Sequence, residues 1–528
     1  MLGRGAGSRA AATAEARLAS ERIRIDGQGL TLEMVERVAR GEALSVELDP
    51  AARKEMLRAR RVVERAVAGG TAVYGVTTGF GRLADHVISP DERTDLQRNL
   101  VRSHAAGVGR PLERAAVRAI VLLRANALAR GRSGCRPEVV ERLLELLEHG
   151  VHPVVPETGS VGASGDLAPL AHVALALIGE GSVEVEGEPM PAADALARAG
   201  LAPLALEAKE GLALINGTQA TTGLGLLALL RAERALEALE CAGAMSLEAL
   251  KGTPEAFRAE VHALRAHPGQ TASAARLRAL LADSQIRESH RHGDPRIQDA
   301  YSLRCMPQVH GAARQALGYA RWVLEVEVNS VTDNPLILPD EGLVVSAGNF
   351  HAQIVAQALD LTCIAMADLA AVSERRVERL LNPDLSQGLP AFLAGSPGIE
   401  SGLMITQVTA VDLLAELRVL AHPASVDSVS TSASQEDHVS MGLAAARKAR
   451  RAVECLERVA AVELLCAAEG IEHRRPLRAG KGVERAHEAV RSRVPRLAGD
   501  RPPGPDLEAI HALLLEGAFT PGRLGIEP

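Results

Sequence analysis

Apolar residues recur every three or four positions along most of the chain, which is the spacing that places side chains on one face of an α-helix. The segment 140–147 carries such a face and stops at Gly150. A second face over 56–67 stops at the pair Gly69-Gly70. Because glycine commonly follows the last turn of a helix, both patterns predict amphipathic helices that end at these positions.

Two segments in the second half are much longer than an ordinary helix. His351–Leu381 has no glycine or proline before Asn382-Pro383, and Leu443–Glu469 has none before Gly470. Helices of that length bury their apolar faces best against one another. The pattern therefore predicts a mainly α protein built on a long antiparallel helical bundle.

Strict apolar and polar alternation is confined to short segments in the N-terminal part. Ile23-Arg-Ile-Asp-Gly and Val183-Glu-Val-Glu-Gly both alternate and then end in a glycine turn, which is typical of short strands. We therefore expect a disordered tail over 1–22, a smaller mixed α/β part over 23–215, and a helical bundle over 216–528.

Composition narrows the class of protein. Hydrophobic residues make up 47% of the 528 residues and aromatic residues only 2%, so the core is built from Leu, Ala and Val. A net charge of −7 and a pI near 6.2 provide no basic excess to neutralise phosphates, which argues against a nucleic-acid partner. The six cysteines include no C-x-x-C pair, so neither a disulfide framework nor a zinc site is predicted. His290 and His292 are expected in a polar loop rather than at a metal.

Nothing in the sequence favours a membrane or a secreted protein. Leu212–Leu230 is uncharged and long enough to span a bilayer, but Asn216 and several threonines lie inside it. Such polar groups are costly in hydrocarbon, so this segment is predicted to be buried in protein. The first twenty residues lack the apolar core of a secretory signal. By elimination, a cytoplasmic location is expected.

The most informative stretch is Gly159-Ser-Val-Gly-Ala-Ser-Gly-Asp-Leu-Ala-Pro-Leu-Ala-His172. The Gly165 amide has no Cβ beside it, so in a tight loop its nitrogen can approach the carbonyl carbon of Ala163. Ring closure with loss of one water, and loss of the Ser164 hydroxyl as a second, would leave a five-membered ring with an exocyclic methylene. That ring is an electrophile, which none of the twenty side chains provides. Asp166 stands where it could cap a following helix, whose positive end would then face the ring.

This stretch resembles the signature of the aromatic amino acid ammonia-lyases, whose prosthetic group is 4-methylidene-imidazol-5-one (MIO). A plain Gly/Ser loop is the alternative, but the match also includes Asp166, Pro169 and His172. The resemblance extends from about Ile23 to about Ile510. It implies the aspartase/fumarase-like helical fold, a homotetramer with active sites shared between chains, a small amino acid substrate, and no external cofactor.

The resemblance also assigns site residues. Tyr74-Gly-Val-Thr-Thr-Gly-Phe-Gly81 is similar to the family's mobile loop with its essential tyrosine, although Thr77 stands where Asn is common. Asn216 is assigned to the prosthetic group and the substrate carboxylate, and Arg304 to a two-pronged contact with that carboxylate. In the segment 431–440, Ser434 stands where Asn or Gly is more frequent in the family. The remaining assignments are Gln298 and Tyr301 from the segment 298–311, Phe350 over the bound side chain, Glu436 from 431–440, and His104 as the side-chain selector.

The activity implied is elimination of ammonia from L-histidine to give trans-urocanate. Tyr74 is the first choice for the base that removes the β-proton, with Tyr301 and Glu436 as the other acid–base candidates. His104 with Glu436 would supply polar partners to an imidazole ring. Three alternatives stay open: a phenylalanine or tyrosine ammonia-lyase, a 2,3-aminomutase that returns ammonia to Cβ, and a helical scaffold whose loop never matures.

Overall fold

The computed structural model describes residues 22–42, 45–69, 73–79, 86, 88–89 and 92–526. The predicted tail over 1–22 lies outside these residues except for Arg22, which begins the first strand. The chain divides into two compact units, of which the first comprises 1–227, 322–357 and 424–447. The second comprises 228–321, 358–423 and 448–528.

The first unit mixes helices with short strands. Its elements are β1 (Arg22–Ile25), α2 (Leu32–Ala39), β2 (Ser45–Leu48), α3 (Pro50–Ala68), α4 (Arg93–His104), β3 (Val108–Pro111), α5 (Arg114–Ala129), α6 (Pro137–Glu148), β4 (His152–Pro153), β5 (Pro156–Thr158), α7 (Leu167–Leu177), β6 (Ser182–Val185), β7 (Glu188–Pro191), α8 (Ala192–Arg198), α9 (Glu210–Ile215), β8 (Leu336–Leu338), β9 (Leu343–Val345) and the 3-10 turn η5 (Ser432–Ser434).

The strands form small separate sheets. β1 and β2 pair in parallel with Arg22 opposite Ser45, and β4, β6 and β7 form an antiparallel sheet of three strands. β3 pairs with β5, and β8 with β9, both antiparallel. The two strands predicted from alternation are confirmed as β1 and β6. The predicted amphipathic helices are confirmed as α3 and α6.

The second unit is helical over the residues that the structure describes. Four long helices span both units: α10 (Gln219–Ala249), α15 (Met306–Glu327), α16 (Gln353–Leu381) and α18 (Gly442–Glu472). The second unit adds η3 (Pro254–Phe257), α11 (Ala259–Ala263), α12 (Pro268–Leu280), α13 (Gln285–Glu288), α14 (Tyr301–Arg304), η4 (Ala391–Leu393), α17 (Met404–Leu420), α19 (Lys481–Arg491), α20 (Gly504–Leu515) and α21 (Pro521–Leu524).

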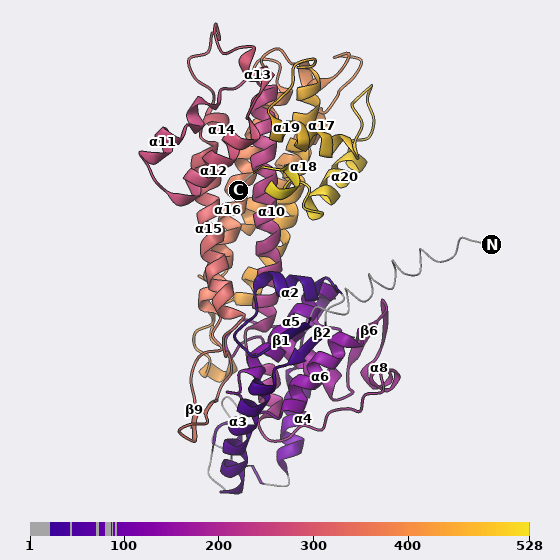
Figure 1. Cartoon of the computed structure of the whole chain (residues 1–528). Helices are drawn as coiled ribbons and strands as arrows, with labels where there is room; N and C mark the ends of the chain where they lie inside the picture. The colour runs from indigo at the N-terminus through magenta and orange to yellow at the C-terminus, as the bar shows by residue number, and fades with distance from the viewer. Residues whose placement is uncertain are drawn as a thin grey trace, which may run out of the picture. The chain divides into compact units, whose positions relative to one another are not determined.

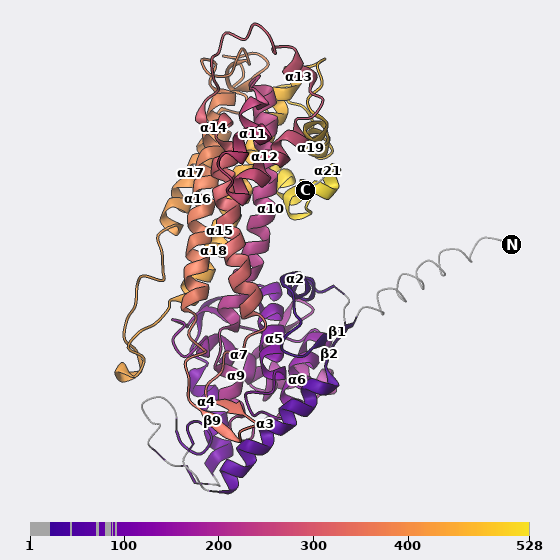
Figure 2. The same ribbon diagram turned by 60° about the vertical axis from the view of Figure 1, so that its left-hand side comes forward.

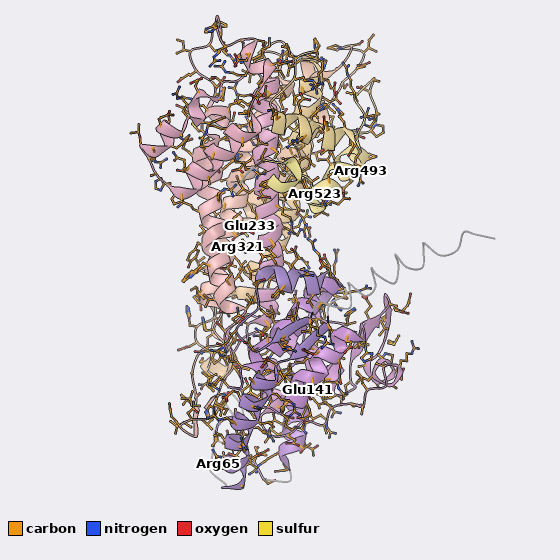
Figure 3. All side chains as sticks on the ribbon, in the orientation of Figure 1. Arg65, Glu141, Glu233, Arg321, Arg493 and Arg523 are labelled. Carbon is orange, nitrogen blue, oxygen red and sulfur yellow. The ribbon has the colours of Figure 1, made fainter. Side chains whose placement is uncertain are left out.

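The long helices lie side by side as a bundle (Figures 1 and 2). Glu233 on α10 and Arg321 on α15, both labelled in Figure 3, form a two-pronged ion pair at 2.6 and 2.8 Å. Arg314 on α15 reaches Glu240 on α10, so these two helices run antiparallel. The predicted helical bundle is confirmed.

Not every neighbouring pair in the bundle is antiparallel. Lys448 contacts Asp360 and Arg376 contacts Glu463, so α16 and α18 run in the same direction. Two helical stretches, Glu210–Ala249 and Gln353–Leu381, are long and apolar enough to cross a membrane. Their most apolar windows are 94% and 61% buried within the protein, as is common for core helices.

Candidate active site

The stretch 159–166 forms a loop between β5 and α7 that is tied to a segment far away in sequence. The backbone of Gly162 has φ +66°, and its carbonyl accepts a hydrogen bond from Ser440 Oγ at 2.9 Å. The Met441 amide donates to the Val161 carbonyl at 2.8 Å. The loop shape is therefore set by residues just before α18.

Gly165 has no room for a side chain. Its backbone has φ +81°, and a Cβ there would lie 2.5 Å from the Gly217 nitrogen. The following amide, Asp166 N–H, donates to the Gly217 carbonyl at 2.6 Å. Only glycine combines this conformation with so close an approach of two backbone segments.

Asp166 precedes the first residue of α7, but its carboxylate does not cap that helix. It instead accepts from the Thr221 amide at 2.7 Å and the Thr221 hydroxyl at 3.0 Å, in the first turn of α10. Ser160 Oγ also donates to it at 2.8 Å. Complete burial raises the pKa of Asp166, against these hydrogen bonds, which lower it. The cap expected for α7 is thus wrong, and the carboxylate binds the first turn of α10 instead.

Asn216 lies at the end of α9 and bonds directly to the loop. Its Nδ2 donates to the Ser164 carbonyl at 2.8 Å, while its buried Oδ1 has no donor among the described residues. The sequence alone indicated a buried amide that needs partners, and the structure gives it one partner and leaves one acceptor open.

Glu436 also faces the loop, at the Ser164 hydroxyl. The Ser164 hydroxyl donates to its Oε1 at 2.5 Å, and Thr431 Oγ1 donates to its Oε2 at 2.7 Å. The neighbouring turn holds Ser432, Ala433 and Ser434 at φ values of 51°, 53° and 66°. Three successive non-glycine residues in the left-handed region are a strained arrangement of the kind found at functional sites.

These groups line one cavity of about 1000 Å³ within the first unit. Of the residues singled out from the sequence, the lining includes Tyr74, His104, Ala163, Ser164, Asn216, Phe350 and Glu436. Gly165 lies at the back of the loop against Gly217 rather than on the cavity wall. The structure thus brings together side chains that are up to 362 positions apart, Tyr74 and Glu436 (436 − 74).

His104 lies at the end of its helix and also lines the cavity. It is the last residue of α4, and its Nδ1 lies 2.9 Å from the carbonyl of Leu100 in the same helix. Because a carbonyl only accepts, Nδ1 carries the proton and Nε2 keeps its lone pair. The ring therefore closes its own helix and also presents an acceptor among the cavity-lining residues.

The Tyr74 loop is described only in part. Tyr74 to Thr77 form a turn in which Gly75 has φ +66°. Phe80 and Gly81, the end of the predicted mobile loop, lie outside the described residues.

Gln298, Tyr301 and Arg304 line a different cavity, of about 400 Å³, in the second unit. The Arg304 guanidinium carbon lies 4.6 Å from the centre of the Tyr301 ring, a cation–π contact. Its buried Nε has no acceptor in the described ranges of the chain. Tyr301 is 71% exposed. Tyr301 and Arg304 both lie on the short helix α14, but neither residue lines the cavity around Ser164.

Sequence reasoning did not single out several residues of the larger cavity. His351 and His438 stack with parallel rings 5.7 Å apart, and both line it, as does Asn334. All three fall in short polar segments of the sequence, at 329–335, 348–351 and 431–440. Among the described residues no group of three His, Cys, Asp or Glu side chains could hold a metal ion.

The chain is similar to known proteins over almost its whole length. The family model for aromatic amino acid lyases matches residues 30–492. A histidine ammonia-lyase of Stigmatella aurantiaca is 54% identical over 496 residues, covering 94% of this chain and 97% of the relative.

Solved structures of related proteins are similar to this chain as well. The histidine ammonia-lyase from Trypanosoma cruzi superposes with a TM-score of 0.89 at 42% identity, covering 96% of this chain and 95% of that one. The tyrosine aminomutase from Streptomyces globisporus gives 0.89 at 40% identity, covering 94% and 97%. With the family model matched over 30–492 and a relative 54% identical over 94% of the chain, the chain belongs to the aromatic amino acid lyase family.

Proposed function

We propose that this protein is a histidine ammonia-lyase, which eliminates ammonia from L-histidine to give trans-urocanate. The observation that carries the proposal is the single cavity that holds the Ser164 loop, Asn216, Glu436 and His104 together. The 54% identity to a histidine ammonia-lyase over nearly the whole chain supports the same choice of substrate.

The loop fits an MIO group formed from Ala163, Ser164 and Gly165. Gly165 occupies a cradle that a Cβ would fill, and the Ser164 carbonyl is already held by Asn216. Within the described part of the chain, Asn216 Oδ1 is a buried acceptor without a donor. When present, the group supplies an electrophile that makes the substrate amine a better leaving group. No external cofactor is required for this chemistry.

The side chains of the cavity would carry out the rest of the reaction. Tyr74 removes the proton on the β-carbon of the substrate, the electrons of that bond form the double bond, and the bond from the α-carbon to nitrogen breaks. Glu436 is placed to exchange a proton with the departing amine, since its carboxylate already faces the loop. Phe350 lies against the substrate side chain, and His104 Nε2 accepts the imidazole N–H.

Arg304 would hold the substrate carboxylate with its planar guanidinium, and Gln298 and Tyr301 would complete that end of the site. In a single chain these three residues line a separate cavity, so a site that needs all of them is best built from more than one copy. We therefore propose a homotetramer with shared active sites.

An exposed apolar face supports this assembly. On α17 Ile405, Val408 and Val419 are 61%, 58% and 75% exposed, and Leu361 and Ile364 on α16 are also exposed. Exposed apolar side chains of this kind fit an interface between identical copies. A cytoplasmic location is part of the same proposal.

Product analysis tests the substrate and the reaction together. L-histidine, L-tyrosine and L-phenylalanine are offered in one mixture, and the products are identified by chromatography and mass spectrometry. Urocanate as the main product supports the proposal, and a cinnamate or coumarate as the main product contradicts the substrate. A β-amino acid would indicate the aminomutase reaction, which the similarity to tyrosine aminomutase makes the second candidate.

Mixed oligomers test the shared site. Ser164→Ala and Arg304→Ala variants, each inactive alone, are co-expressed with different affinity tags and purified through both tags. Activity regained in the mixture means that Ser164 of one chain works with Arg304 of another. No gain in doubly tagged assemblies would mean that both residues act within one chain.

A further inference from the structure

Arg124 is a fully buried cation that contacts no carboxylate among the residues that the structure describes. It lies on α5 and is 0% exposed. Its guanidinium donates to the Asn216 carbonyl at 2.9 Å, to Gln219 Oε1 at 2.7 Å and to the Ala213 carbonyl. These acceptors belong to the last turn of α9, the residue after it, and the first residue of α10. Burial lowers the pKa of Arg124, so the protein keeps it at an electrostatic cost.

The contacts place Arg124 directly behind the turn that shapes the Ser164 loop. A Cβ on Gly217 would collide with the Arg124 guanidinium, and a Cβ on Gly165 would collide with Gly217. Arg124, Gly217 and Gly165 are therefore stacked without spare room. The Gly217 carbonyl accepts from the Asp166 amide, and the Asn216 side chain holds the Ser164 carbonyl.

A second set of contacts holds Gln219, one of the acceptors of Arg124, in place. Gln219 Nε2 donates to Thr332 Oγ1 at 2.8 Å, while its oxygen accepts from Arg124. The neighbouring Asp333 forms a buried ion pair with Lys209 at 2.6 Å, and its charge also acts on Arg124. Arg124 thus rests on groups from three segments, and its position is well determined.

We propose that Arg124 is a positioning residue for maturation of the loop. It holds the 216–217 turn against Gly165, so that the Gly165 nitrogen is presented to the Ala163 carbonyl carbon. This inference rests on the proposed function, because it assumes that the loop cyclises.

The proposed cyclisation releases two water molecules. A bond forms between the Gly165 nitrogen and the Ala163 carbonyl carbon. The carbonyl oxygen leaves as water with the protons of the Gly165 and Ser164 amides, leaving a double bond to the Ser164 nitrogen. The Ser164 hydroxyl then leaves with the proton on its α-carbon as the second water, which creates the methylene. Arg124 takes no part in these bonds and acts only through the turn.

Arg118 offers a matched control on the same helix. It also donates to two backbone carbonyls of other elements, Val38 at 2.7 Å and Leu147 at 3.2 Å, and burial also lowers its pKa. None of its contacts leads to the loop. Arg124→Met and Arg118→Met therefore remove similar guanidinium contacts, and only the first removes support from Gly217.

Intact-protein mass spectrometry on the folded full-length chain tests the proposal. The wild type should be lighter than its encoded mass by two waters. Arg124→Met should retain the encoded mass, or mature at least tenfold more slowly over a time course, and Arg124→Lys should fall between them. Arg118→Met should mature as the wild type does, whatever its melting temperature.

Folded Arg124→Met that matures at the wild-type rate would overturn the proposal, and so would an equal delay in Arg118→Met. If Arg124→Met does not accumulate as folded protein, Gln219→Met decides by the same measurement: slowed maturation supports the proposal and a wild-type rate overturns it. A wild type of unreduced mass would instead refute the MIO group itself, so the two failures are distinguishable.

Discussion

The Ser164 hydroxyl donates a hydrogen bond of 2.5 Å to Glu436 Oε1, although the two residues are 272 positions apart. The second oxygen of the carboxylate is occupied by Thr431, so the carboxyl group is held in one orientation. Glu436 is therefore aimed at the side chain that the proposed chemistry consumes.

Replacing Glu436 by Gln keeps an oxygen for Ser164 but removes the charge and the ability to exchange a proton. We expect the mass loss of two waters to persist and kcat to fall roughly 100-fold, which is typical for loss of a general acid–base group. Intact mass and steady-state kinetics on the same preparation measure both effects. An unchanged kcat would exclude Glu436 from proton transfer.

Replacing Arg304 by Lys keeps the positive charge but loses the planar fork. Because a loosely held substrate also reacts slowly, we expect KM to rise about tenfold or more and kcat to fall with it. Arg291→Lys is a suitable control, since Arg291 is exposed and pairs with the exposed Glu288. Kinetics of Arg304→Lys that match the control would show that another group binds the carboxylate.

Replacing His104 by Phe removes the Nε2 acceptor from the cavity and the Nδ1 contact with Leu100. We expect a strong loss of activity on histidine, about 100-fold in kcat/KM, and weak new activity on phenylalanine. Ser103→Ala, which alters the neighbouring hydroxyl alone, should change kcat/KM for histidine much less. If Phe at position 104 leaves the substrate preference intact, the selector lies elsewhere in the cavity.

Glu248 makes the stability of the second unit depend on pH. It accepts hydrogen bonds from Ser284 Oγ at 2.7 Å and the Gly480 amide at 3.0 Å, and burial raises its pKa to about 7. The folded state binds this proton more tightly than the unfolded state, so the free energy of unfolding falls as pH rises from about 4.5 to about 7.

The protonated Glu248 adds roughly 3 kcal/mol to the free energy of unfolding at low pH, and this amount is lost once the pH is well above 7. Glu248→Gln should abolish it, so the variant gains stability over the wild type as pH increases through this range. Chemical denaturation at several pH values measures the difference, with the exposed Glu255→Gln as the control. Parallel pH profiles for wild type and Glu248→Gln would contradict the prediction.

Much of the fold could be predicted from local patterns in the sequence. The faces over 56–67 and 140–147 predicted α3 and α6, because three-to-four-residue spacing and terminal glycines act within one helix. The long uninterrupted segments predicted α16 and α18 to within three residues at each end. What these patterns could not give is helix direction, because the parallel run of α16 and α18 depends on long connections.

The sequence motifs identified the residues of the candidate site, but they could not predict how those residues are arranged in space. Ser164, Asn216 and Glu436 stood out as chemical groups in unusual surroundings, and the structure places them around one cavity. That Arg304 lines another cavity could not be read from spacing along the chain. Arg124 did leave a signal, a lone charge in the apolar run 119–129, but its acceptors lie about 90 residues away.

The hydrogen bonds from Ser440 and Met441 to Gly162 and Val161 also bear on when the proposed electrophile could form. Gly162 and Ser440 are 278 positions apart, so a ribosome makes the loop long before it makes this partner. If cyclisation needs the loop shape that these bonds set, the loop would stay an ordinary peptide until the segment 440–441 has folded against it. The proposed modification would then be a late event in the folding of each chain.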